Sequence, residues 1–414
     1  MSTHCSMLGE CWTVVVYWEN MKILIASDLH YPTINGVATF GRSLAIGLAN
    51  RGHEVMVIAP SQTSKKFKEI DVNHVVIRTA SVPFVPYQNF RISPTPGREV
   101  KKAMLDFDPD VIHIQMLMWI GQAAMKYGNK FGIPIISTNH AMPENLMDNI
   151  LLLAPIARPI NFMLRQYGMR FHSKADYITM PTQSAIDMFN LSEKITVPME
   201  AVSNGIDLVR FQPGNPGPEI YRQFKLPPNK PIISYVGRVD AEKHLPVLVK
   251  AFAKVRKKHD AHLMIVGSGQ EVLNLKEIAH ELGVYSHVTF TGRVSEEDKV
   301  LLHQIGTVFA MPSPAELQSI ATLEAMASGQ PVVAVDAGAL RELCQDGRNG
   351  YLCRKDDVEQ FAEAIIKILD DPKEQKRMSE ESLAIAHLHD LDATLDRFEA
   401  IYKELANLET NNAT

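Results

Sequence analysis

The chain has 414 residues, 46% of them apolar and 21% charged, which is typical of a soluble globular protein with two domains. The formal net charge of −5 gives no support for a nucleic-acid partner. The four cysteines are too few for a disulfide framework at this length and show no metal-ligand spacing. The low cysteine count indicates a reduced, cytoplasmic setting. No apolar run approaches the roughly 20 residues that span a bilayer.

The first twenty residues contain only a short apolar run, Val14–Trp18, and lack the basic start of a signal peptide. We expect residues 1–20 to be an N-terminal extension without function. The first clear strand follows directly after Met21.

Short apolar strands then alternate with segments of helical spacing. We predict strands over Ile23–Ala26, Val55–Ala59, Val75–Arg78, Val111–Ile114, Ile133–Ser137 and Tyr177–Met180, and helices over Phe40–Asn50, Val100–Phe107 and Gly121–Phe131. This alternation predicts a parallel sheet covered by helices on both faces.

The segment Ile150–Lys174 differs from its neighbours because apolar residues alternate with five basic ones along it. The spacing predicts one amphipathic helix or a broken pair. Two interpretations stay open: a helix packed on the sheet, or a surface that rests on anionic lipid.

A break follows at Asn204–Asp207 and at the Pro/Gly-rich Pro213–Pro218, which we take as the linker between domains 21–207 and 208–389. The second half repeats the strand–helix alternation, and residues Glu374–Leu408 are predicted to be helical almost throughout. The fold class is therefore α/β, with two tandem doubly wound domains. Ligands of such sheets bind at the carboxyl ends of the strands, so the cleft between the domains is the expected site.

The strongest functional signal is the segment Pro312–Val335, which places Glu316 and Glu324 eight residues apart. We predict that Glu324 lies in a helix over Ile320–Met326 and that Glu316 lies in the loop leading into it. The N–H groups at a helix start bind anions, and carboxylates beside them can hold sugar and ribose hydroxyls. The segment therefore favours a sugar-nucleotide site.

Two cations follow the strand predicted over Pro231–Val236. Arg238 and Lys243 are five residues apart in the next loop, beside a helix expected to begin near Leu245. By itself this pair also fits an ordinary solvated loop. Together with the Glu316–Glu324 segment it indicates diphosphate binding, because fixed cations stabilise the charge on a leaving diphosphate without a metal.

Three more candidates follow predicted strands. The turn Asn35-Gly36 offers N–H groups to a phosphate across the cleft, and Gly267 allows backbone to approach a nucleotide or another loop closely. His140 is placed to orient a sugar or an acceptor hydroxyl, with a purely structural role as the alternative. The missing GxGxxG motif argues against a nicotinamide enzyme.

From Met21 onwards the chain resembles the family 4 glycosyltransferases, which have the GT-B fold. The residues that carry the resemblance are Asn35–Val37, Gly52-His53, Asn204–Asp207, Gly237-Arg238 with Lys243, Gly267–Gly269, and Glu316-x7-Glu324 followed by Ala-Met-Ala-x-Gly-x-Pro. The resemblance implies two Rossmann-like domains, with the acceptor on the first and the nucleotide sugar on the second. It also implies a C-terminal helix, from about Asp390, that packs back on the first domain.

The resemblance further implies roles for single residues. Arg238 and Lys243 would bind the diphosphate, Glu316 the donor-sugar hydroxyls and Glu324 the ribose, and His140 corresponds to a histidine beside the sugar.

The other implied donor contacts are made by the backbone. Arg293 and Val294 would meet the base, and the amides of Ser319 and Ile320 would meet the sugar or phosphates. The family commonly has Gly where Ser319 stands, which leaves the geometry of this loop open. The remaining donor-site residues are Asn35, Gly36, Val37 and Gly267.

Members of this family move a sugar from a nucleotide diphosphate with retention of configuration. The residues around His140 resemble diacylglycerol glucosyltransferases and phosphatidylinositol mannosyltransferases. We therefore expect a retaining hexosyltransferase acting on a membrane lipid such as diacylglycerol, peripheral on the inner face of an anionic membrane. A soluble glycan or polysaccharide acceptor, a sugar-nucleotide epimerase and an inactive binding protein are the alternatives. The sequence calls for no cofactor beyond the nucleotide-sugar co-substrate, and Mg²⁺ on its diphosphate stays compatible with it.

Overall fold

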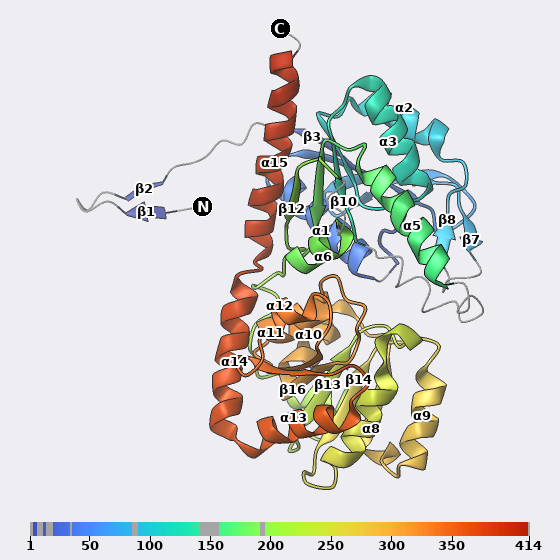
Figure 1. Ribbon diagram of the computed structural model, residues 1–414. Coiled ribbons are helices and arrows are strands. Elements are labelled where there is room, and N and C mark those ends of the chain that lie inside the picture. The colour runs from blue at the N-terminus through green and yellow to red at the C-terminus, as the bar shows by residue number, and fades with distance from the viewer. Residues whose placement is uncertain are drawn as a thin grey trace.

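The computed structural model describes residues 3–5, 11–13, 20–33, 35–84, 90–140, 157–190 and 195–412. Two parallel sheets, each set between helices, form an upper and a lower domain in Figure 1. Ahead of them, β1 (Thr3–Cys5) and β2 (Cys11–Thr13) pair as an antiparallel hairpin that stands apart from both domains. The α/β fold class predicted from the alternating pattern is confirmed.

The first sheet has eight strands in the order β12-β11-β10-β9-β3-β4-β6-β5, and only β5 runs antiparallel to its neighbour. These strands are β3 (Lys22–Ala26), β4 (Glu54–Pro60), β5 (Phe67–Asp71), β6 (His74–Thr79), β9 (Val111–Ile114), β10 (Ile135–Thr138), β11 (Tyr177–Met180) and β12 (Met199–Ala201). All residues of β9 and β10 are buried, as their apolar runs predict. The strands β5 and β12 were missed, because β5 is largely exposed and β12 has only three residues.

Helices cover both faces of this sheet, and a small β-hairpin lies beside it. The helices are α1 (Gly36–Asn50), α2 (Gly97–Phe107), α3 (Trp119–Phe131), α5 (Ala157–His172) and α6 (Gln183–Phe189), and the hairpin is β7 (Val82–Phe84) with β8 (Phe90–Ile92). Within Ile150–Lys174 the described residues form the single helix α5, and residues 150–156 lie outside the described part of the chain.

The second sheet is parallel throughout, in the order β15-β14-β13-β16-β17-β18. Its strands are β13 (Ile232–Val236), β14 (His262–Val266), β15 (Val288–Gly292), β16 (Val308–Met311), β17 (Val332–Val335) and β18 (Gly350–Cys353). The surrounding helices are α7 (Pro218–Gln223), α8 (Leu245–Val255), α9 (Val272–Glu281), α10 (Glu296–Ile305), α11 (Ile320–Ala327), α12 (Leu340–Leu343) and α13 (Val358–Asp370). The strand order reverses between β13 and β16, which puts the loop after β13 at the position where such sheets bind ligands.

The C-terminal helical region is not continuous, contrary to the prediction for Glu374–Leu408. It consists of α14 (Pro372–His387) and α15 (Leu391–Asn412), and the residues between them pair with the linker. Ile206 donates its N–H to His389 O at 2.7 Å and accepts from Leu391 N at 3.0 Å, so the freed backbone groups keep partners. The break lets α15 cross to the first domain (Figure 1), where its apolar side chains join the core of α1, β3 and β4.

Candidate functional site

A cavity of about 800 Å³ lies between the two domains and is lined by residues of both. Seven of the site residues predicted from the sequence line it: Asn35, Gly36, Val37, His140, Arg238, Lys243 and Glu316. Six others, all within the described part of the chain, lie outside its lining: Gly267, Arg293, Val294, Ser319, Ile320 and Glu324. Asn139, directly before His140, also lines the cavity, and residues 141–156 lie outside the described part of the chain.

The cationic end of the cavity is built on the loop after β13. Lys243 Nζ lies 2.6 Å from Glu316 Oε1, and Arg238 bonds Asp240 at 2.7 Å and also Glu242. Burial opposes ionisation of Glu316, but the Lys243 charge outweighs it and lowers the pKa of this carboxyl. Both members of the pair are therefore ionised, and the two predicted diphosphate-binding cations are already matched by carboxylates.

Asp240 and Glu242 were missed as site residues, although both lie between the two cations in the sequence. The spacing of Arg238 and Lys243 was evident, but which acid each would meet depends on the short helical turn Ala241–Lys243.

Glu324 is held by α10 and is only 4% exposed. Its carboxylate accepts from Lys299 Nζ at 2.7 Å and contacts His303 Nε2 at 3.2 Å. Burial opposes ionisation, but Lys299 and His303 outweigh it and lower the pKa of Glu324 to about 2. Lys299 and His303 carried no signal in the sequence, because α10 meets α11 only in the folded domain.

Two helix starts, those of α1 and α11, lie close to each other. Asn35 caps α1, with Oδ1 accepting from Ala38 N at 2.9 Å, so the predicted turn Asn35-Gly36 is the start of a helix. Ser319 caps α11 and accepts from the hydroxyl of Thr322 at 2.8 Å. A Cβ added at Gly36 would lie 3.8 Å from Ile320 Cδ1, so the two N-termini are close neighbours. The free N–H groups at a helix start suit an anion.

Gly267 serves the packing of two loops. Its φ is +138°, and a Cβ there would stand 1.8 Å from the carbonyl oxygen of Gly237. Its N–H donates to Gly292 O at 3.0 Å, just before Arg293 and Val294. The sequence predicted that Gly267 lies close either to a nucleotide or to another loop. In the structure it lies close to the loop that begins at Gly237.

His140 ends a chain of buried hydrogen bonds that reaches the C-terminal helix. Its Nε2 lies 2.6 Å from Gln115 Oε1, Gln115 Nε2 lies 2.9 Å from His113 Nε2, and His113 Nδ1 lies 2.6 Å from the hydroxyl of Tyr402. Burial, and then the charge of His172, lowers the pKa of His140 to about 3, so its ring is neutral at pH 7. With the Gln115 amide assigned in this orientation, His140 carries its proton on Nε2 and leaves Nδ1 as an acceptor.

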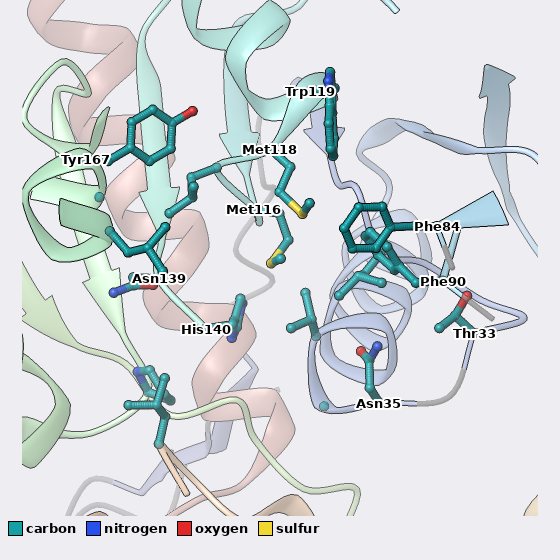
Figure 2. A pocket seen from close by; sticks show the side chains of 18 of the residues that line it. Thr33, Asn35, Phe84, Phe90, Met116, Met118, Trp119, Asn139, His140 and Tyr167 are labelled. Carbon is teal, nitrogen blue, oxygen red and sulfur yellow. The ribbon is translucent and has the colours of Figure 1, made fainter. Parts of the chain in front are cut away.

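The other end of the cavity is apolar and comes from the first domain. Figure 2 shows Met116 and Met118 standing between the rings of His140 and Trp119 in this view, with Phe84 and Phe90 to one side. None of these residues was predicted as part of the site, since apolar positions at strand and helix ends look like ordinary core in a sequence.

The helix α5 closes this apolar end and also has an outward apolar face. Leu164, Arg165 and Tyr167 line the cavity. On the same helix Phe162 and Met163 are 64% and 68% exposed. Over the described residues, no helix combines the length and the apolar character needed to cross a membrane.

Comparison with known proteins agrees with this geometry. The Glycosyltransferase Family 4 model matches residues 34–210, and the model Glycosyl transferases group 1 matches residues 218–383. The α-monoglucosyldiacylglycerol synthase of Streptococcus pneumoniae is 26% identical over 341 residues, which cover 80% of this chain and 75% of that protein. The GDP-mannose-dependent α-(1-6)-phosphatidylinositol monomannoside mannosyltransferase of Mycobacterium tuberculosis is 25% identical over 368 residues, covering 84% and 89%.

Solved structures share the architecture. Sucrose-phosphate synthase from Thermosynechococcus elongatus superposes with a TM-score of 0.76 at 20% identity, covering 94% of this chain and 99% of that one. The two family models, which match successive parts of the chain, show the family, and the superposition shows the fold. The chain belongs to the family 4 glycosyltransferases of the GT-B fold.

Proposed function

We propose that this glycosyltransferase moves a hexose, with retention, from a nucleotide-diphosphate sugar to the hydroxyl of a membrane lipid such as diacylglycerol. One observation carries the proposal. A single cavity joins the cations Arg238 and Lys243 to an apolar wall of the first domain, and His140 also lines it.

The donor end suits a diphosphate that leaves during transfer. Lys243 and Arg238 are held near each other by Glu316, Asp240 and Glu242, so their positions are set before a ligand arrives. An incoming diphosphate takes over part of these contacts and gains stabilisation as its negative charge grows in the transition state. Glu316 is then available to the hydroxyls of the donor sugar.

The acceptor end suits an apolar molecule with one reactive hydroxyl. Met116, Met118 and Trp119 offer apolar area, and unbranched methionines adapt to flexible chains. The names of two relatives, a synthase of monoglucosyldiacylglycerol and a phosphatidylinositol monomannoside mannosyltransferase, support a lipid acceptor.

For the displacement we favour attack of the acceptor hydroxyl on the face from which the diphosphate leaves, with the diphosphate taking the proton. Among the described residues, the carboxylates that line the cavity are Glu242 and Glu316, and both pair with a cation. Paired carboxylates are poor nucleophiles, which supports this route. Mass-spectrometric detection of a glycosylated side chain during turnover would overturn it.

The donor and acceptor are tested together. Release of nucleoside diphosphate is measured from UDP-, GDP- and ADP-sugars, with and without vesicles of diacylglycerol and anionic phospholipid. We expect release from one donor that depends on lipid and is lost in Glu316→Gln, which keeps the side-chain volume. Lipid-independent release, or an epimerised nucleotide sugar without any acceptor, contradicts the lipid proposal.

The apolar wall is tested by Met118→Gln, a substitution of similar size that adds a polar group. We expect the KM for lipid to rise about tenfold while the KM for the donor stays unchanged, because roughly 1–2 kcal/mol of apolar burial is lost. Leu273→Gln, at an exposed position on α9, is the matched control. Equal effects of both variants contradict an acceptor role for this wall.

Membrane contact through α5 is part of the same proposal. Phe162 and Met163 are exposed on α5, and the exposed basic residues Arg170 and Lys174 follow in the same segment, a combination that binds anionic interfaces. The double variant Phe162→Ser, Met163→Ser is expected to lose co-sedimentation with anionic vesicles, whereas Leu273→Ser is expected to keep it. Unchanged sedimentation of the double variant would remove α5 from the contact.

A further inference from the structure

A second cluster of chemistry-bearing side chains lies outside the cleft, between α1 and the β5–β6 hairpin. It consists of His30 in the loop after β3, Asp71 at the end of β5 and His74 at the start of β6. One possible ligand atom from each residue lies within 4.8 Å of those of the other two. None of the three lines the interdomain cavity in the described structure.

Three of the four ring nitrogens in this cluster lack a hydrogen-bond partner in the described structure. His30 is 2% exposed, and neither of its ring nitrogens has a hydrogen-bond partner in the described structure. His74 is 3% exposed, and its Nε2 is equally unmatched there. Buried polar atoms are nearly always satisfied, so three unmatched nitrogens beside one carboxylate call for a bound species.

The chemistry of the three residues suits a particular class of ion. Two imidazoles and one carboxylate are ligands of zinc and its neighbours, whereas magnesium and calcium prefer oxygen alone. Burial, and next the charge of Arg78, lowers the pKa of His30 to about 3, so this imidazole is neutral as a ligand must be. Three protein ligands leave one coordination position for water.

The surroundings hold the carboxylate in place. Arg42 donates to both oxygens of Asp71, at 2.7 and 2.8 Å, which leaves further lone pairs for a metal. The second nearby cation, Arg78, is directed to Glu69 at 2.7 Å and to the carbonyl of Tyr31 at 2.6 Å. These positive charges weaken metal binding but leave the three ligand positions unobstructed.

A small cavity reaches the carboxylate of the cluster. A cavity of about 220 Å³ is lined by Asp71, Arg78, Tyr31 and Pro32 and lies against the carboxylate. Zinc–ligand bonds of about 2.0–2.1 Å put tetrahedral ligands roughly 3.3 Å apart, so small side-chain rotations bring the three atoms into range.

We propose that His30, Asp71 and His74 bind one zinc-class dication, which ties the loop after β3 to the β5–β6 hairpin. That loop continues through Thr33 to Asn35, both of which line the main cavity. The ion therefore steadies the approach to the start of α1 and takes no part in sugar transfer. The inference is independent of the proposed acceptor and donor.

The test is titration of the chelator-stripped protein with Zn²⁺ by calorimetry and with Co²⁺ by visible absorption. Cysteine thiolates bind zinc strongly, so Cys5 and Cys11 are replaced by serine in every sample. We expect one equivalent of each metal, Co²⁺ absorption of four-coordinate type, and a higher Tm with Zn²⁺ than with Mg²⁺. Absence of saturable binding in this protein overturns the proposal.

Variants locate the site. His74→Gln is expected to lose the one equivalent of bound metal and the rise in Tm with Zn²⁺. His280→Gln, at an exposed histidine, is expected to keep both. Equal binding by the two variants overturns the assignment. If His74→Gln does not fold, the zinc ligands of the parent protein are identified by zinc K-edge X-ray absorption. A coordination shell without two imidazoles would also overturn the assignment.

Discussion

Replacing Gln115 with methionine is expected to disable His140 while leaving the fold intact. Gln115 is fully buried and bonds His140 on one side and His113 on the other. Methionine has a similar shape but keeps neither bond. His140 Nε2 then loses the acceptor that keeps its proton there, and the ring is free to turn its proton toward the cavity.

The magnitude follows from the bond that is lost. A buried group left without its partner costs about 1–3 kcal/mol, which corresponds to about a 5- to 150-fold loss of the productive tautomer. His113 keeps Thr138 Oγ1 at 2.6 Å and Tyr402 at 2.6 Å, so most of the network survives. The variant is therefore expected to fold, with a loss of unfolding free energy of no more than about 1–3 kcal/mol, and the main effect is expected on kcat.

The assay is steady-state release of nucleoside diphosphate with the preferred donor and acceptor. In Gln115→Met we expect kcat to decrease by about 5- to 150-fold, while the KM for the donor changes less than twofold. Gln223→Met, at an exposed glutamine of α7, controls for the substitution itself. A folded Gln115→Met protein with unchanged kcat would refute the positioning of His140 by this chain.

Three further predictions concern stability. The fold lowers the pKa of Glu324 from 4.5 to about 2. Its contribution to the unfolding free energy is therefore full above pH 4.5 and is lost as the pH falls toward 2. Urea unfolding is expected to show a loss of about 3 kcal/mol over this range. The Cβ added in Gly267→Ala would clash with a backbone oxygen, and the positive φ at this position is unfavourable for alanine. This variant is expected to lower the unfolding free energy by about 3–5 kcal/mol. Phe398→Ala, in the fully buried seam of α15, is expected to cost about 3–5 kcal/mol by the same measurement.

Each of these has a matched control. Lys299→Met removes the main partner of Glu324 and should reduce the acid-induced loss, and an unchanged pH profile would contradict the pairing. Gly283→Ala has φ +68° but no neighbour within 4 Å, so it is expected to cost only about 1–2 kcal/mol. Leu388→Ala, at a 76% exposed side chain, is expected to stay within about 0.5 kcal/mol, and costs equal to the test variants would refute the packing argument.

Much of the architecture was predictable because it depends on the local pattern of apolar and polar residues. Apolar runs such as Val111–Ile114 form strands where both faces are covered, and a capped apolar segment such as Ile320–Ala327 forms a helix. Short stretches of chain also contain two signals of the site: the spacing of Glu316 and Glu324, and the pair Arg238 and Lys243. These signals sufficed for the fold class and the family.

The partners of those residues were decided by the tertiary structure. Lys243 meets Glu316 across 73 residues of sequence, Glu324 meets Lys299 across 25, and His113 meets Tyr402 across 289. No periodicity links such positions, because their distance depends on strand order, on helix packing and on the break that turns α15 back to the first domain. The sequence by itself determined which chemistry the chain carries, and the folded topology decided which charges neutralise one another and which ring nitrogens face the cleft.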